Sequence, residues 1–114
     1  HNNGTPIRNW LHAQDTAAAI IKIIESNKRN EVYNIASGFE QANVDTVRKV
    51  ISEYTENKDI DLKKYVNLSY SRKGQDVRYA LNDDKLRALG WEPKEKFDDV
   101  LPKIVKYYKE NFIW

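Results

Sequence analysis

The chain contains no cysteine and no methionine among its 114 residues. Without cysteine it can have no disulfide framework, no cysteine-ligated zinc site and no thiol nucleophile. Its two histidines, His1 and His12, have no companion residues at metal-ligand spacing, so we expect no metal site. Because methionine is absent, His1 is not a translation start, and we expect the chain to be a fragment of a longer polypeptide.

Glycine is also scarce. The four glycines lie at positions 4, 38, 74 and 90, which is too far apart to form a G-x-x-G-x-x-G turn. That turn is the usual support for the pyrophosphate of a dinucleotide cofactor. We therefore expect the chain to bind no such cofactor by itself.

Long apolar runs and an excess of one charge are missing as well. A membrane span needs about 20 consecutive apolar residues, and no such run occurs in this chain, whose mean hydropathy is -0.79. No signal-peptide pattern opens the chain, so we expect a cytoplasmic protein that does not bind membranes. The 19 basic and 17 acidic residues are spread along the chain and give a net charge of +2. This balance argues against nucleic acid as a partner, which would require a clustered basic excess.

What the sequence does contain is an alternation of short strand patterns and amphipathic helix patterns, which predicts an α/β fold. The expected elements are strands at residues 7–11, 31–36 and 66–70, and helices at residues 14–26, 44–55, 83–89 and 98–111. Asn82 is a suitable N-cap for the third helix, and Gly90 is placed to end it in a left-handed conformation. Three short strands make a thin sheet, so we expect them to lean on a sheet supplied elsewhere.

The apolar positions of the three longer helices recur at helical spacing and predict the faces turned to a core. These positions are Ala17, Ile20, Ile21, Ile24, Val47, Val50, Ile51, Tyr54, Leu101, Ile104, Val105 and Tyr108. Trp91 and the tyrosines of the last helix are also expected in the core. Residues 72–76 interrupt this pattern as an exposed segment broken by glycine.

Four stretches together carry a family resemblance. Residues 4–15 (GTPIRNWLHAQD) are similar to the pattern G-x-x-x-R-D-W-L-x-V-x-D, and residues 31–38 (EVYNIASG) to E-x-Y-N-I-G-G. Residues 72–82 (RKGQDVRYALN) are similar to R-P-G-H-D-R-R-Y-A-I-D, and residues 89–93 (LGWEP) to L-G-W-x-P. Over essentially its whole length the chain therefore resembles the C-terminal part of extended short-chain dehydrogenase/reductase enzymes. The nucleotide-sugar epimerase/dehydratase family, and within it dTDP-glucose 4,6-dehydratase, gives the closest pattern.

This resemblance implies a function. Enzymes of this kind use bound NAD to oxidise the sugar at C4, eliminate water across C5 and C6, and return the hydride. Their C-terminal part holds the nucleotide and diphosphate of the substrate. The resemblance thus implies that residues 1–114 are a small sugar-nucleotide-binding domain, partnered by an N-terminal NAD-binding Rossmann part in a homodimeric parent. The domain alone, without the NAD turn and the catalytic Tyr/Lys pair, should be inactive.

Seven residues fall at the family's substrate-binding positions. They are Arg8, Asn43, Arg72, Lys73, Gly74, Gln75 and Asp76. The residue types suit the task, because arginine offers a planar fork of donors that matches phosphate oxygens. A glycine in the segment would let the backbone approach a ligand closely. Lys73 and Gln75 stand where the family has proline and histidine, and this bears on which nucleotide and sugar are bound.

Each of these residues has a simpler alternative role. Arg8 could be a surface arginine on an edge strand, and Asn43 could be a helix N-cap. Arg72 and Arg78 could lie in a solvated loop, and Tyr79 is expected to pack under that loop rather than touch a ligand.

Tyr54 and Lys58 match the Tyr-x-x-x-Lys spacing of the superfamily's catalytic pair. With seven tyrosines in a lysine-rich chain such a match arises by chance, and Tyr54 belongs to the apolar stripe of its helix. We therefore expect no catalytic residue here.

Three classes of function remain open. The first is the substrate-binding part of a 4,6-dehydratase, with a sugar-nucleotide epimerase or decarboxylase of the same superfamily as its neighbour. The second is a free-standing nucleotide- or protein-binding module without catalysis. The third, a small nucleic-acid-binding domain, fits poorly with the diffuse charge.

Overall fold

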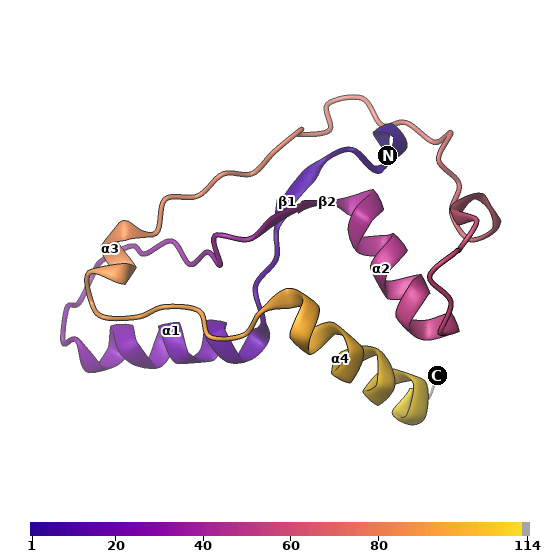
Figure 1. The fold of residues 1–114 in the computed structure, drawn as a ribbon. Helices are drawn as coiled ribbons and strands as arrows, with labels where there is room; N and C mark the ends of the chain where they lie inside the picture. Colours follow the sequence, from indigo (N-terminus) through magenta and orange to yellow (C-terminus); the bar gives the residue numbers. More distant parts are fainter. Residues whose placement is uncertain (113–114) are drawn as a thin grey trace.

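The computed structural model describes residues 1–112. Two short strands lie at the centre, α1 and α4 lie along one side, and the uncoiled chain that leads to α3 arches along the other (Figure 1). In chain order the elements are η1 (Asn2–Gly4), β1 (Ile7–Asn9), α1 (Ala13–Glu25), β2 (Glu40–Ala42), α2 (Asn43–Thr55), η2 (Leu62–Lys64), α3 (Asp84–Arg87) and α4 (Phe97–Asn111), where η denotes a short 3-10 helix. The predicted mixture of helices and strands is confirmed.

The three long helices begin within one residue of their predicted starts, because their local signals are strong. At the start of α1 the ring nitrogen Nδ1 of His12 accepts a hydrogen bond from the Gln14 amide (3.2 Å), and Asp15 stands in the first turn. The first turn of α4 carries Asp98 and Asp99, whose charges suit the helix dipole. None of the helices within residues 1–112 is both long and apolar enough to cross a membrane.

The shorter helix α3 is confirmed in place but covers only Asp84–Arg87. The predicted N-cap, Asn82, is wrong, because the N-cap is Asp83. Asn82 lies one position earlier, and its Oδ1 accepts a hydrogen bond from the Asp84 amide (3.0 Å). Gly90 follows with φ +83, the left-handed conformation that glycine adopts without strain. The chain can therefore turn sharply toward Trp91.

The sheet is a two-stranded antiparallel ribbon in which Ile7 pairs with Ala42 and Arg8 with Gln41. On the other edge of β1, the uncoiled segment between η2 and α3 (residues 65–83, called the arch below) adds one parallel bridge, between Ile7 and Arg78. The Ile7 amide donates to the Val77 carbonyl across this edge (2.8 Å). The central strand β1 thus joins two segments that lie far apart in the sequence.

Two predicted strands are wrong. Residues 31–36 and 66–70 form no strand in this structure, while β2 at Glu40–Ala42 was not predicted. A strand pattern needs a neighbouring strand to complete its hydrogen bonds, and among residues 1–112 the segment 31–36 has none. The side chain of Val32 is accordingly 82% exposed.

The tightest core lies between α1, α3 and the segment after Gly90. Ala19, Leu86 and Trp91 form its centre, and Trp91 is buried as predicted. The partly buried residues packed around them are Leu11, Ile23, Tyr33, Ile35 and Leu89. This cluster holds α1 and α3 together.

Asp15 is the charged residue buried at the edge of this core, with 4% of its surface exposed. Its two carboxylate oxygens accept hydrogen bonds from the amides of Lys94 (2.9 Å) and Glu95 (3.0 Å), while its carbonyl accepts from the Trp91 indole (3.2 Å). One residue at the start of α1 therefore fixes the chain that leads into α4.

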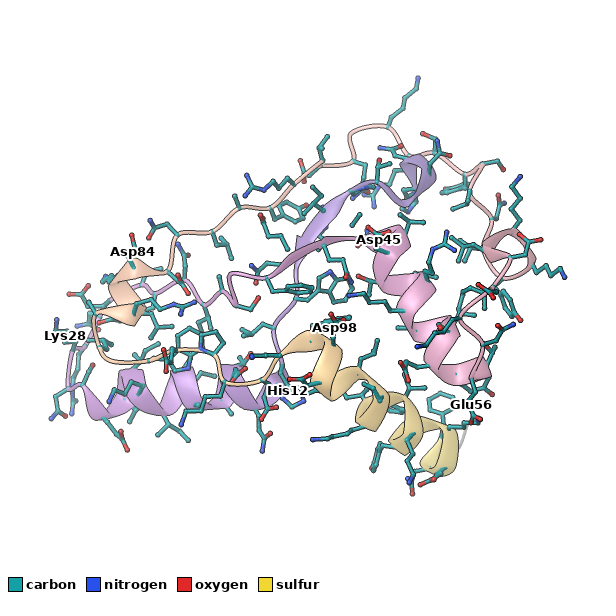
Figure 2. All side chains as sticks on the ribbon, in the orientation of Figure 1. His12, Lys28, Asp45, Glu56, Asp84 and Asp98 are labelled. Carbon is teal, nitrogen blue, oxygen red and sulfur yellow. The ribbon has the colours of Figure 1, made fainter. Side chains whose placement is uncertain are left out.

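A second contact region joins α2 to α4. The ring of Phe97 stacks on Phe39 with a centroid distance of 5.4 Å and meets Trp10 edge-on at 6.0 Å. Lys49 of α2 forms an ion pair with Asp98 (2.5 Å) and lies over both phenylalanine rings. Figure 2 labels Asp98 at the start of α4.

Several of the predicted buried faces are wrong. On α1 the exposed fractions of Ile20, Ile21 and Ile24 are 48%, 55% and 70%, and Ala17 is exposed as well. On α4, Leu101 is buried as predicted, but Ile104, Tyr107 and Tyr108 are exposed, as are Val50 and Tyr54 on α2. The helical periodicity was read correctly, but residues 1–112 supply no element that covers these faces.

Candidate functional site

The candidate site lies where the arching segment meets β1. Arg8 reaches out of β1, and its guanidinium donates to the Ile7 carbonyl (2.7 Å) and to the Asp76 carbonyl (3.2 Å). The ring of Tyr79 lies beneath the same guanidinium, 4.3 Å from its central carbon to the ring centroid. Arg8 is thus held by two neutral carbonyls and an aromatic face. None of these contacts cancels its charge.

Arg78, a few residues along the arch, has the opposite arrangement. Its guanidinium forms a two-pronged ion pair with Glu40 of β2, at 3.0 and 2.6 Å. Hydrogen bonding to Arg78, reinforced by its charge, lowers the pKa of Glu40, and the same bond raises the pKa of Arg78. Arg78 is exposed, as the solvated-loop alternative expects, but it also ties the arch to the sheet and its charge is compensated.

Tyr79 is bonded to the same segment and is influenced by two arginine charges. The Tyr79 hydroxyl donates to the carboxylate of Asp76, and this bond is the main reason that the pKa of Tyr79 is raised. The charges of Arg8 and, as the smallest contribution, Arg72 act on that pKa in the opposite direction. Of these two arginines, Arg8 has a direct contact with the Tyr79 ring in the described part of the chain.

The loop that follows Arg72 is exposed and open at Gly74. Gly74 has φ +72, and a methyl group built in place of its Cα hydrogen would meet no atom within 4 Å. The backbone at this point is therefore free to be approached from outside, as the sequence predicts for a ligand-contacting glycine. Lys73 is exposed and Gln75 is half-buried, and neither side chain forms a hydrogen bond within residues 1–112.

Asn43 lies at the first residue of α2, where its amide donates to the Pro6 carbonyl (3.0 Å). The N-cap is Ala42, so the alternative that Asn43 caps the helix is wrong. The Asn43 side chain, which is half-buried, has no hydrogen-bond partner in the described part of the chain. It lines a cavity of about 120 Å³. An amide group without a partner beside a cavity is available to a ligand.

Sequence reasoning missed two features of this site. It placed Asp76 among the substrate-binding residues without foreseeing its contacts: the Asp76 carboxylate accepts from Tyr79 and its carbonyl accepts from Arg8. It also placed Tyr79 under the loop without connecting it to Arg8. No sequence signal marks an aromatic ring that will lie under an arginine 71 positions away, because the contact depends on how the arch folds back.

Two further observations concern other parts of the molecule. Within residues 1–112 no group of three or more His, Cys, Asp or Glu side chains could hold a metal ion. A second cavity, of about 410 Å³, lies between the start of α1, α2 and α4. Its walls include Trp10, Val50 and Leu101, and His12, labelled in Figure 2, stands at the start of α1 beside it. This cavity is apolar and carries no grouped charges.

The mixed α/β fold matches about a third of the extended short-chain dehydrogenase/reductase fold. Comparison with known families agrees: the model described as "GDP-mannose 4,6 dehydratase" matches residues 1–104. The chain therefore belongs to this NAD-dependent nucleotide-sugar epimerase/dehydratase family.

Curated relatives are similar over the whole chain. The dTDP-D-glucose 4,6-dehydratase of Homo sapiens is 31% identical over 113 residues, which are 98% of this chain and 32% of the human protein. The dTDP-glucose 4,6-dehydratase 1 of Escherichia coli K12 is 33% identical over 117 residues, covering 100% of this chain and 32% of the relative. The chain thus spans about a third of the length of the relatives it matches.

Solved structures give the same result. The dTDP-glucose 4,6-dehydratase of Bacillus anthracis in complex with NAD superimposes with a TM-score of 0.78 at 33% identity, covering 97% of this chain and 34% of that one. DesIV, the dTDP-glucose 4,6-dehydratase of Streptomyces venezuelae with NAD and TYD bound, gives 0.79 at 29% identity over 95% of this chain and 32% of DesIV. The predicted fold class is confirmed by these matches.

Proposed function

We propose that this chain is the substrate-binding part of an NAD-dependent nucleotide-glucose 4,6-dehydratase similar to dTDP-glucose 4,6-dehydratase, and that Arg8 and Arg72 bind the diphosphate of its sugar nucleotide. The observation that carries the proposal is the contrast between Arg8 and Arg78. Arg8 is held in place with its charge uncompensated, while Arg78 is neutralised by Glu40.

The chemistry of a diphosphate suits this arrangement. Phosphate oxygens accept two parallel N–H bonds from a guanidinium, and such charge-assisted bonds are worth about 1.5–3 kcal/mol each. Arg8 uses only two of its donors on backbone carbonyls, so further N–H groups are left for a ligand. Asn43 and the backbone at Gly74 are the proposed neutral contacts. Lys73 and Gln75 complete the proposed set of ligand contacts, with Lys73 adding a further positive charge at the rim. Asp76 lies in the same segment, but its carboxylate is already bonded to the Tyr79 hydroxyl.

The composition of this chain indicates which functions the rest of the parent enzyme supplies. NAD would oxidise the sugar and later return the hydride. The residues that bind it, and the catalytic base, are proposed to lie in an N-terminal Rossmann part, because this chain has neither the glycine-rich turn nor a credible Tyr/Lys pair. The exposed isoleucines of α1 support such a partner, since they give it an apolar surface to cover. We further propose a homodimeric parent in the cytoplasm, and no activity for the chain alone.

A sugar-nucleotide epimerase is the second candidate. UDP-glucose 4-epimerase from Bifidobacterium longum, at 18% identity and a TM-score of 0.70, shares the fold, so the fold does not separate the two reactions. The dehydratases are favoured because several relatives of that name reach 30–34% identity. Incubating the natural-length protein with dTDP-glucose and NAD distinguishes the candidates: a 4-keto-6-deoxy product supports the dehydratase, and a 4-epimer supports the alternative.

Binding of dTDP tests the site directly. Calorimetric titration of the natural-length protein should give a dissociation constant that rises at least tenfold, about 1.4 kcal/mol, in Arg8→Gln. Arg78→Gln is the matched control, because it removes an arginine of the same segment whose charge Glu40 already compensates. Equal losses in the two variants would contradict the assignment of Arg8. Absence of dTDP binding by the wild type, together with retention of nucleic acid or a protein, would favour a different kind of binding module.

A further inference from the structure

We propose that Tyr79 and Asp76 are positioning residues that hold Arg8 in the orientation in which it binds the substrate diphosphate, without contacting the substrate themselves. This inference rests on the proposed function, since it concerns the same site. It assigns a new role to Tyr79 and changes the role expected of Asp76 from ligand to support.

The contacts form a closed triangle. The Tyr79 ring lies 4.3 Å from the centre of the Arg8 guanidinium, and the Tyr79 hydroxyl donates to the Asp76 carboxylate. The Asp76 backbone carbonyl in turn accepts from Arg8 (3.2 Å). Each of the three residues is therefore fixed by the other two, although Arg8 lies 68 positions before Asp76 in the chain.

The carboxylate and the backbone carbonyl of Asp76 contact different partners, and this difference suits the binding of an anion. If its carboxylate faced Arg8, the two charges would pair, as Glu40 and Arg78 do, and a phosphate would have to displace the carboxylate. Instead the carboxylate is occupied by the Tyr79 hydroxyl, and only the neutral carbonyl meets Arg8. The guanidinium is thus held while it keeps its full charge for an anion.

Holding Arg8 matters because a free arginine loses much side-chain entropy when it binds. An immobilised rotamer-rich side chain costs about 0.5–1.5 kcal/mol at an interface. A side chain already fixed by its neighbours avoids most of that cost when the ligand arrives, which is the general advantage of preorganisation. Tyr79 is 50% exposed, so its ring contributes little to the core and its side chain instead contacts Arg8 and Asp76.

The variants separate the two contacts of Tyr79. Tyr79→Leu removes both the ring and the hydroxyl, and it should weaken dTDP binding about fivefold, the range of an exposed cation–π contact. Tyr79→Phe keeps the ring under Arg8 but frees Asp76, and it should weaken binding about twofold. Tyr65→Leu is the matched control, because Tyr65 is similarly exposed (55%) and its ring has no partner ring or cation within residues 1–112.

The deciding experiment is a double-mutant cycle, measured by titrating the natural-length protein with dTDP and with thymidine. If Tyr79 acts through Arg8, Tyr79→Leu has no further effect on the dTDP dissociation constant in the Arg8→Gln background. Thymidine, which lacks phosphate, should bind equally to all variants. Thermal unfolding is followed in parallel, and the melting temperature of Tyr79→Leu should match that of Tyr65→Leu.

The outcomes distinguish this inference from the proposed function. Suppose that the wild type binds dTDP, and that the affinity losses of the two single variants add in the double variant or that Tyr79→Leu causes no loss. Either result overturns the positioning role and leaves the proposed function standing. No dTDP binding by the wild type overturns the proposed function and the inference with it. A fivefold loss confined to proteins that retain Arg8 supports both.

Discussion

The molecule contains two charged centres that are built in opposite ways. At the start of α1, Asp15 is buried and both of its oxygens are used by backbone amides of its own chain. Beside the arch, Arg8 is fixed by carbonyls and by an aromatic ring, and its charge stays uncompensated. The difference indicates two roles for a charged side chain. A charge whose hydrogen-bonding groups are all used by the chain itself stabilises the fold. A charge that is held in place without an opposite charge is available to bind a ligand.

The largest expected effect is on stability, from replacing Asp15. Asp15→Ala removes two charge-assisted hydrogen bonds and leaves two amides without acceptors, so the free energy of unfolding should fall by about 3–6 kcal/mol. Urea denaturation followed by tryptophan fluorescence measures this. Asp15→Asn, which keeps one acceptor oxygen, should lose less. If Asp15→Ala unfolded at the same urea concentration as the wild type, Asp15 would not stabilise the fold, and the contrast with Arg8 would be contradicted.

Two glycines offer the next largest effect. Gly4 and Gly74 both have φ above +70, but a Cβ on Gly4 would lie 2.6 Å from the Cβ of Val44, while a Cβ on Gly74 would meet nothing. Both alanine variants bear backbone strain of about 1–2 kcal/mol. Only Gly4→Ala adds overpacking of about 1–3 kcal/mol. The melting temperature of Gly4→Ala should therefore be lower than that of Gly74→Ala. The reverse order would contradict the open environment of Gly74.

Salt should affect the two centres differently. Exposed charges are screened over a Debye length of about 8 Å at physiological ionic strength. Raising the salt concentration should therefore weaken dTDP binding severalfold, and less so in Arg8→Gln. The stability difference between wild type and Asp15→Ala should change little over the same range. Calorimetry and denaturation at two salt concentrations measure both quantities, and salt-independent dTDP binding would argue against a phosphate contact.

The smallest effect concerns the compensated pair. The bond to Arg78 lowers the pKa of Glu40 below 4.5 in the folded state, so the ionised pair stabilises the fold above that pH. This contribution is lost as the pH falls through the lowered pKa of Glu40, because the carboxylate then becomes protonated. The stability difference between wild type and Glu40→Gln should accordingly shrink on acidification. Denaturation curves at neutral and acidic pH measure it, and a difference that grows in acid would contradict the pairing.

The helices could be predicted from the sequence because their signals are local. Residues 98–111 were expected and Phe97–Asn111 is observed, since apolar spacing and acidic first turns need no distant partner. Strands could not be predicted in the same way. The segment 31–36 has a strand composition but no neighbour to bond, whereas Glu40–Ala42 forms a strand because β1 lies beside it.

The same limit applies to the site. The resemblance supplied Arg8 and Arg72, and the fold places the Arg8 guanidinium on the ring of Tyr79. The support by Tyr79, the pairing of Arg78 with Glu40 and the anchoring by Asp15 join residues 38 or more positions apart. Such contacts depend on the tertiary path of the chain, and no short pattern encodes them.

The anchoring of residues 94 and 95 by Asp15 also bears on the order of folding. These bonds close a loop of about 80 residues, and loop closure over such a separation is entropically costly. Contacts of this range tend to form after local helices, so α1 and α2 should be present in the folding transition state before Asp15 finds its amides. Loss of the Asp15 carboxylate would then act mainly on the unfolding rate, and the lifetime of the folded chain would depend on a bond that contributes little to how fast it folds.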